Sequence, residues 1–175
     1  MNTVAEQVAS HLLQIKAIKL EPNHPFTWAS GWKSPIYCDN RKTLSYPEVR
    51  TYIRDQFVNL IKTKYPQVEL IAGVATGAIA QGALVAQEFE CPLVFAKKTK
   101  TKNIAGDVYT SKVESFTHGT TYDIIVSKRF LNEGDKVLIV DDFLAIGNAL
   151  NGLIDLVNAL SLIHISEPTR RSYIS

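Results

Sequence analysis

The chain has 175 residues; 46% of them are hydrophobic and 21% are charged, and 19 basic against 17 acidic side chains leave a net charge of +2. This composition fits one globular domain with enough apolar residues for a core, and it excludes a disordered, collagen-like or low-complexity chain. The even charge balance argues for neither a nucleic-acid nor a membrane partner.

The compartment can be predicted from the cysteines and from the first residues. The cysteines are Cys38 and Cys91, and a reduced cytoplasmic protein is the simplest expectation, with one disulfide between them left open. The N-terminal sequence lacks the basic and apolar regions of a signal peptide. The longest uncharged run, residues 70–87, is too short for a comfortable membrane span.

The first part of the chain predicts a helix followed by an irregular segment. Residues 3–17 carry apolar side chains at helical spacing, and Thr3 with Glu6 has the pattern of a capping box at the helix start. Residues 19–40 hold three prolines, two tryptophans, a phenylalanine and a tyrosine. This segment is expected to be irregular, with short strands such as residues 36–38.

A second helix is predicted over residues 46–64. Pro47 would lie in its first turn, where the missing N–H has no intrahelical partner to lose. The side chains expected to form its buried stripe are Val49, Ile53, Phe57, Leu60 and Ile61.

From residue 68 onward, strands alternate with helices. The predicted strands are 68–74, 93–96, 122–127 and 137–140, and the predicted helices are 78–88 and 147–159. The alternation favours an α/β fold with a parallel sheet flanked by helices. The polar stretch of about 99–120 is expected to be a flexible loop, long enough to close as a lid and exclude water.

Two adjacent carboxylates, Asp141 and Asp142, end the apolar strand 137–140. Ligands of open parallel sheets bind beyond the carboxyl ends of the strands, and the small residues at 145–149 open a helix whose free N–H groups suit a phosphate. The carboxylates could accept hydrogen bonds from two neighbouring hydroxyls, such as those of a ribose. The alternative is that Asp142 only caps the following helix.

A second turn of small residues, containing Thr76 and Gly77, joins strand 68–74 to its helix. Its backbone N–H groups could hold a second anionic group. The alternative is a tight turn that needs glycine for steric reasons alone. Two such turns in one small domain indicate a ligand with two separated phosphate groups.

Four lysines, at positions 97, 98, 100 and 102, follow strand 93–96. At the end of that strand they would neutralise a polyphosphate leaving group. A solvated run of charge and a nucleic-acid contact are the alternatives; no nucleic-acid motif accompanies the lysines.

These three motifs, in this order, resemble the type I phosphoribosyltransferases, which bind phosphoribosyl pyrophosphate (PRPP). The resemblance implies that Asp141 and Asp142 hold the ribose hydroxyls and that Thr76 and Gly77 lie at the pyrophosphate. It assigns the 5′-phosphate to Ala145, Ile146, Gly147, Asn148 and Ala149. Lys97 and Lys98 are the expected PRPP contacts among the lysines, and Lys98, Lys100 and Lys102 the expected catalytic lysines. Mg²⁺ is implied through PRPP, near the two aspartates but without a direct protein ligand.

The two halves of the chain resemble different members of this family. Residues 1 to about 83 are similar to orotate phosphoribosyltransferase, on the segments 26–37, 41–47 and 73–77. Residues from about 84 to 159 are similar to xanthine phosphoribosyltransferase, on the segments 94–98, 115–117, 122–128 and 141–145. The sequence departs from these patterns at Ala29, Thr101, Asn103 and Ile146. The resemblance therefore suggests a chimera.

The last residues, 160–175, resemble the translation of a sequencing adapter. We expect them to be a non-native tail on a single phosphoribosyltransferase domain, 1–159, truncated at its C-terminus. The alternative is a real C-terminal strand over residues 160–165, followed by a basic end.

The resemblance implies an enzyme that converts a nucleobase and PRPP to a nucleoside monophosphate and pyrophosphate. The segment of about 19–40 would form a hood over the base, with Tyr37 and Cys38 as its base contacts. The orotate-like hood makes orotate of pyrimidine biosynthesis the first choice, and xanthine of purine salvage the alternative. A PRPP-binding module without catalysis is a further alternative, and a homodimer is implied by the family.

Overall fold

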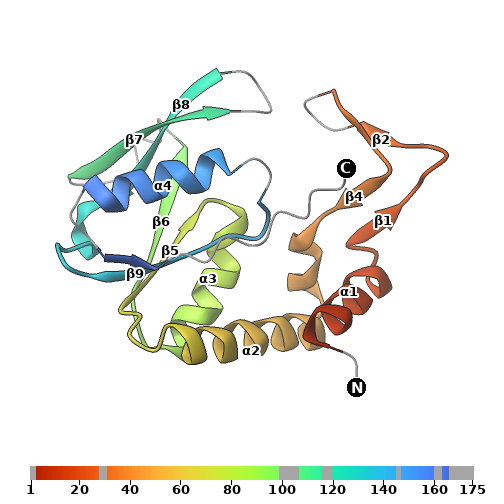
Figure 1. Cartoon of the computed structure of the whole chain (residues 1–175), viewed down its shortest axis with the longest axis horizontal. Coiled ribbons are helices and arrows are strands. Elements are labelled where there is room, and N and C mark those ends of the chain that lie inside the picture. The colour runs from red at the N-terminus through yellow and green to blue at the C-terminus, as the bar shows by residue number, and fades with distance from the viewer. Residues whose placement is uncertain are drawn as a thin grey trace. The chain divides into compact units, whose positions relative to one another are not determined.

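The computed structural model describes residues 3–27, 31–98, 107–115, 120–144, 147–159 and 163–165 (Figure 1). The chain forms two compact units. The first comprises Met1–Pro66 with Ser115–Thr120, and the second comprises Gln67–Glu114 with Thr121–Ser175. We describe each unit by itself.

The first unit begins with helix α1, Val4–Gln14, and confirms the predicted capping box. The backbone N–H of Glu6 donates to Thr3 Oγ1 at 3.3 Å, and the backbone N–H of Thr3 donates to Glu6 Oε2 at 2.7 Å. Two N–H groups that have no partner within the helix are thereby satisfied.

Four short strands confirm that the aromatic-rich segment is irregular but locally paired. Strand β1, Ile18–Leu20, pairs antiparallel with β4, Ile36–Cys38. Strand β2, Phe26–Thr27, pairs antiparallel with β3, Lys33–Ser34. The expected hood therefore consists of two two-stranded sheets.

A 3₁₀ helix, η1, at Asn40–Ser45 precedes helix α2, Pro47–Lys64, which begins at the predicted proline. Val49 packs with Ile15 and Ala17 in a small core of this unit. The predicted stripe of α2 is wrong at Leu60, whose side chain is 43% exposed, while Ile61 is 3% exposed. Val58 and Ile61, three residues apart, set the buried side of this part of the helix.

The second unit contains a six-stranded sheet in the order β10-β9-β5-β6-β8-β7. The strands are β5, Leu70–Val74; β6, Leu93–Lys98; β7, Val108–Ser115; β8, Thr120–Ser127; β9, Lys136–Val140; and β10, Ile163–Ile165. Strands β10, β9, β5 and β6 are parallel. Strand β8 pairs antiparallel with β6, so the expected parallel sheet is in fact mixed. An antiparallel strand can join without the crossover helix that a parallel strand needs.

Strand β7 corrects the expectation of a polar loop over about 99–120. Residues Val108–Ser115 are a strand, and β8 begins at Thr120. Val108, Tyr109 and Thr110 have side chains that favour strands, and Tyr109 packs against the main core. Residues 99–106 and 116–119 lie outside the described residues, so the predicted lid stays a prediction for them.

Helices cover both faces of this sheet. Leu70, Ala72 and Val74 of β5 share a core with Leu153, Leu156 and Val157 of α4, Asn148–Ala159. The alternate residue Ile71 faces α3, Gly77–Glu88, because a Cβ placed on Gly82 of that helix would lie 3.7 Å from its side chain. Figure 1 shows α4 above and α3 below strands β5 and β9. A short 3₁₀ helix, η2, at Lys128–Phe130 links β8 to β9.

Strand β10 adds Ile163–Ile165 to the sheet beside β9, with Ile163 opposite Lys136. Of the alternative strand over residues 160–165, the described residues 163–165 are a strand. Residues 160–162 and 166–175 lie outside the described residues, and the adapter origin of 160–175 stays a prediction.

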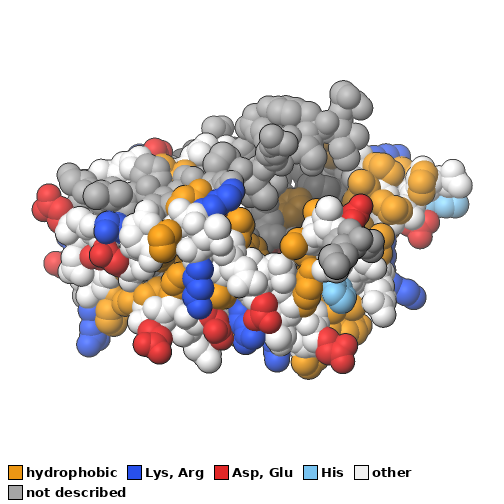
Figure 2. All heavy atoms as spheres, turned by 60° about the horizontal axis from the view of Figure 1, so that its bottom comes forward, with side chains coloured by type: hydrophobic (Ala, Val, Ile, Leu, Met, Phe, Trp, Pro, Cys, Tyr) orange, Lys and Arg blue, Asp and Glu red, His pale blue; other side chains and the backbone are white. Residues whose placement is uncertain are grey.

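On the face shown in Figure 2, acidic and basic side chains of the described residues lie interspersed, as the balanced composition led us to expect. Among the described residues, no helix is long and apolar enough to cross a membrane.

Candidate functional site

The three predicted motifs lie at the carboxyl ends of the parallel strands β5, β6 and β9, on one edge of the sheet. Gly73 of β5 is opposite Val140 of β9, and Val74 is opposite Ala96 of β6. The chain therefore leaves these strands side by side, and the N–H of Ala75 donates to the carbonyl oxygen of Ala96 at 2.8 Å. Thr76 follows β5, the aspartate pair follows β9, and Lys97 and Lys98 end β6.

The two aspartates interact with each other. The backbone N–H of Asp142 donates to Asp141 Oδ1 at 2.9 Å. Asp141 is half-buried, and this burial is the main reason why its pKa is raised to about 6; the neighbouring charge of Asp142 raises it further. Near neutral pH the pair can present oxygen acceptors to hydroxyl donors.

The side chain of Asp142 lies against Gly77, at the start of α3. A Cβ placed on Gly77 would lie 2.5 Å from Asp142 Cγ and 2.7 Å from Oδ2, closer than real Cβ contacts allow. The aspartate pair and the Thr76–Gly77 turn, which the sequence could place only on the same sheet edge, are thus in direct contact. The Ala75–Thr76 peptide bond within this turn is cis.

Close backbone packing holds α3 beneath this edge. A Cβ on Gly73 would lie 2.7 Å from Ala78 Cβ, so the first turn of α3 is seated directly on β5. Thr76 precedes the helix without a side-chain capping bond to it. The Thr76 carbonyl oxygen does accept from the backbone N–H of Ile79 at 3.3 Å.

The second turn of small residues is described only in part. Gly147 has a φ of +91°, a conformation that favours glycine, and its carbonyl oxygen accepts from the N–H of Asn151 at 2.8 Å. Helix α4 begins at Asn148, so Asp142 does not occupy the position directly before the helix, and the alternative that its side chain caps α4 stays a prediction. Asn148 and Ala149 form the first turn, while Ala145 and Ile146 lie outside the described residues.

Among the predicted lysines, Lys97 is the one whose side chain the structure describes. Its Nζ lies 5.2 Å from the centre of the Phe95 ring, at the end of β6. Lys98 is the last residue of that strand. Lys100 and Lys102 lie outside the described residues, and their expected roles stay predictions.

The predicted base contacts, Tyr37 and Cys38, lie in the first unit, on β4. The Tyr37 ring is 5.4 Å from the Phe26 ring, and its side chain is 37% exposed. The sequence did not predict Phe26 as the partner of Tyr37; the signal was the aromatic residue in each of β2 and β4.

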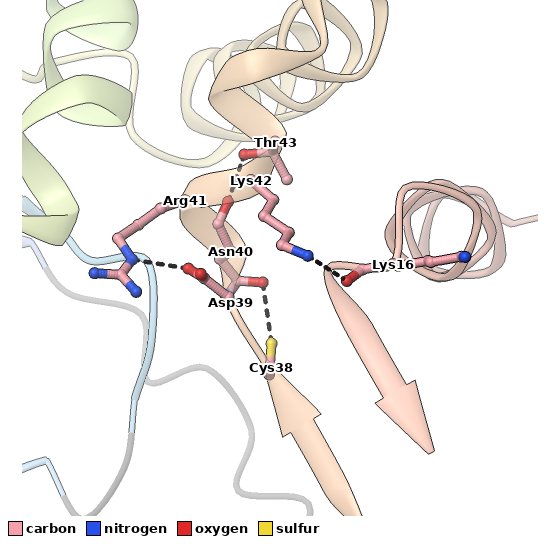
Figure 3. Close-up of polar contacts among 7 residues, drawn as sticks. All are labelled: Lys16, Cys38, Asp39, Asn40, Arg41, Lys42 and Thr43. Atoms are coloured by element: carbon pink, nitrogen blue, oxygen red, sulfur yellow. Dashed lines mark hydrogen bonds and ion pairs between the residues drawn. The ribbon is translucent and has the colours of Figure 1, made fainter. Parts of the chain in front are cut away.

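A polar network follows Cys38 along the chain (Figure 3). The Cys38 thiol donates to Asn40 Oδ1 at 3.2 Å, and Arg41 Nε donates to Asp39 Oδ1 at 2.7 Å. The bond from Arg41 is the main reason why the pKa of Asp39 is lowered. Lys42 Nζ donates to the carbonyl oxygen of Lys16 at 3.2 Å, which ties η1 to the end of α1. The network fixes the backbone that follows the predicted base contacts.

Residues 44–165 match the Phosphoribosyl transferase domain family. This range includes both turns, the lysines and the aspartate pair. The chain belongs to this family.

Within this family, the chain is similar to several orotate phosphoribosyltransferases. The chain is 43% identical over 149 residues to an orotate phosphoribosyltransferase of Porphyromonas gingivalis, and 44% identical over 149 residues to one of Phocaeicola vulgatus. Each match covers 85% of this chain and 62% of the relative, so the chain spans less than two thirds of their length. A match of 149 of 175 residues must cross the expected seam near residue 83.

Solved structures support the fold. The adenine phosphoribosyltransferase of Giardia lamblia, complexed with 9-deazaadenine, matches with a TM-score of 0.71 over 95% of this chain and 83% of that chain, at 24% sequence identity. The α/β fold expected for this family is confirmed, with the mixed sheet described above.

Proposed function

We propose that the chain carries the catalytic fold of an orotate phosphoribosyltransferase of pyrimidine biosynthesis, which transfers the phosphoribosyl group of PRPP to orotate. The identity of 43–44% to orotate phosphoribosyltransferases, across both halves of the chain, is the observation that carries this proposal. In the reaction, the bond from ribose C1 to pyrophosphate breaks, and a bond from C1 to the base nitrogen forms. Pyrophosphate and a nucleoside monophosphate are the products.

Asp141 and Asp142 would accept hydrogen bonds from the two ribose hydroxyls. The contact of Asp142 with Gly77 supports this proposed role, because the carboxylate acceptors then lie next to the proposed pyrophosphate turn at Thr76 and Gly77. The backbone of 145–149 at the start of α4 would hold the 5′-phosphate. Fixed acceptors and N–H groups lower the barrier because they need no reorganisation as charge develops at the ribose.

Carboxylate oxygens next to a phosphate turn are suitable neighbours for Mg²⁺, which prefers oxygen ligands and keeps several waters or phosphate oxygens. Bound to PRPP, the ion would neutralise charge on the departing pyrophosphate. Lys97 and Lys98 would add positive charge at the same edge, and Lys98, Lys100 and Lys102 are the proposed catalytic lysines. None of these residues needs to act as a nucleophile.

Tyr37 and Cys38 are the proposed contacts of the base. The tilted ring pair of Phe26 and Tyr37 offers an aromatic surface, and the Cys38 thiol is held by its hydrogen bond to Asn40. Xanthine is the alternative base, because residues 84–159 resemble xanthine phosphoribosyltransferase. The chimera stays a prediction, and the nucleotide sequence around codons 80–90 would test it.

We further propose that the protein works in the cytoplasm. Among the described residues, neither Cys38 nor Cys91 forms a disulfide, which supports the proposal of a reducing cytoplasm. We propose a homodimer, as the family resemblance implies, and sedimentation of the purified chain would measure its mass.

Two measurements test the function. Turnover with PRPP and Mg²⁺ is measured with orotate, xanthine or adenine; we expect orotate to react fastest, and faster turnover of xanthine would contradict the proposal. In calorimetry, the double variant Asp141→Asn, Asp142→Asn should bind PRPP at least about tenfold more weakly, the equivalent of about 1.4 kcal/mol. The exposed Asp155→Asn is the control, since it lies on α4 outside the proposed site.

A further inference from the structure

The contact between Gly77 and Asp142 implies a role for a residue that has no side chain. The position that a Cβ on Gly77 would occupy is filled by the Asp142 carboxyl group, 2.5 Å from its Cγ and 2.7 Å from its Oδ2. Gly77 has no positive φ that would require glycine for backbone reasons, unlike Gly147 at +91°. The need for glycine at position 77 therefore comes from Asp142.

Neither side of this contact can move away easily. The Gly77 backbone is seated by the close approach of Gly73 to Ala78, where a Cβ would lie 2.7 Å from Ala78 Cβ. Asp142 is the second residue after β9, and its backbone N–H donates to Asp141 Oδ1 at 2.9 Å. A methyl group at position 77 would have to displace the carboxyl group, because the backbones on both sides are fixed by the sheet.

We propose that Gly77 is a positioning residue for the Asp142 carboxylate, so that the turn after β5 fixes the orientation of the acceptor after β9. The inference rests on the proposed function for its meaning in PRPP binding. The contact itself does not depend on any ligand, and it can be tested without one.

A double-mutant cycle on the full chain tests the contact through thermal unfolding. Gly77→Ala should lower Tm by about 5 °C in the wild-type background, as expected for a forced clash of a few atoms. In the Asp142→Ala background the same change should lower Tm by less than about 2 °C, because the space is then empty. In the Asp142→Asn background the loss should persist, because asparagine has the same shape as aspartate.

Gly82→Ala is the matched control. It lies on the same helix, and its Cβ would meet Leu93 Cδ1 at 2.9 Å and not Asp142. Its effect on Tm should be equal in the wild-type and Asp142→Ala backgrounds. Equal losses for Gly77→Ala in these two backgrounds would overturn the proposal, since the glycine would then act independently of Asp142.

PRPP affinity separates this inference from the proposed function. If both hold, Gly77→Ala should weaken PRPP binding at least about tenfold, and the double variant with Asp142→Ala should be no weaker than Asp142→Ala alone. If wild type binds no PRPP, the proposed function fails, while the unfolding cycle still decides whether Gly77 positions Asp142. An intact PRPP affinity in Gly77→Ala would contradict its role in the site.

Discussion

Asp141 carries a carboxyl group whose charge depends on pH close to neutrality. Burial raises its pKa to about 6, and the charge of Asp142 adds to this effect. The folded chain therefore holds this proton more tightly than the unfolded chain, in which the pKa is near 3.8. The resulting contribution to the free energy of unfolding is fully present below pH 3.8 and is lost as the pH rises through about 6.

We predict that the wild type loses stability relative to Asp141→Asn as the pH rises from 4 to 7. The difference should be on the order of 1–2 kcal/mol, since solvent screens a half-buried group. Urea unfolding of both chains at a series of pH values measures it. A difference that is constant with pH would show that Asp141 titrates normally.

The sequence could place the site's residues on one edge but could not predict their contacts. Asp141, Asp142, Thr76 and Gly77 each follow a recognisable apolar strand, and parallel strands bring such residues to the same edge. The contact of Gly77 with Asp142 depends on side-chain direction across two neighbouring strands, which no local pattern encodes. The same holds for the Phe26–Tyr37 ring pair, which joins two separate strand pairs, β2–β3 and β1–β4.

At the level of helices and strands, local signals were reliable where they were strong. The capping box of α1 and the proline at the start of α2 both mark helix ends correctly. Strand β7 was missed because Lys112, Ser111 and Glu114 make its sequence polar, while its pairing with β8 is a tertiary effect. The direction of β8 likewise depends on its neighbour and not on its own residues.

Helix α2 provides a test with neighbouring residues. We predict that Ile61→Ala lowers the free energy of unfolding by about 2–4 kcal/mol, because a buried side chain is replaced by a cavity. Leu60→Ala, at a 43% exposed position, should lower it by less than about 1 kcal/mol. Chemical unfolding of the two variants measures both values. Similar losses would mean that Leu60 is buried after all, as the helical pattern alone predicts.

At the level of the whole molecule, strand order explains why the site lies where it does. The chain runs from β5 through α3 to β6 on one side and later places β9 on the other side of β5. Its helices α3 and α4 then cover opposite faces. The ends of β5 and β9 therefore part in opposite directions, and ligands of α/β sheets bind in the crevice that such a reversal leaves.

The pairing of β10 with β9 gives a prediction for the C-terminal residues. We expect the amides of 163–165 to exchange with solvent more slowly than an unstructured peptide, but faster than those of β9, because a strand of three residues is easily opened. Hydrogen exchange of the full chain, resolved by residue, measures this. Exchange at the unstructured rate throughout 160–175 would instead support a non-native tail that adds nothing to the fold.

The hydrogen bond from Lys136 to Glu69 joins residues 67 positions apart, at the point where β9 enters the sheet beside β5. During synthesis, the turn at Thr76–Gly77 leaves the ribosome long before the aspartates that it contacts. At about 5–20 residues per second, several seconds separate the two. Until β9 is made, the side of β5 that will carry it is an unpaired row of N–H and carbonyl groups. Because the site needs the late pairing of β9 with β5, the growing chain exposes an unpaired strand edge for a time. Such an edge can pair with another chain and cause aggregation.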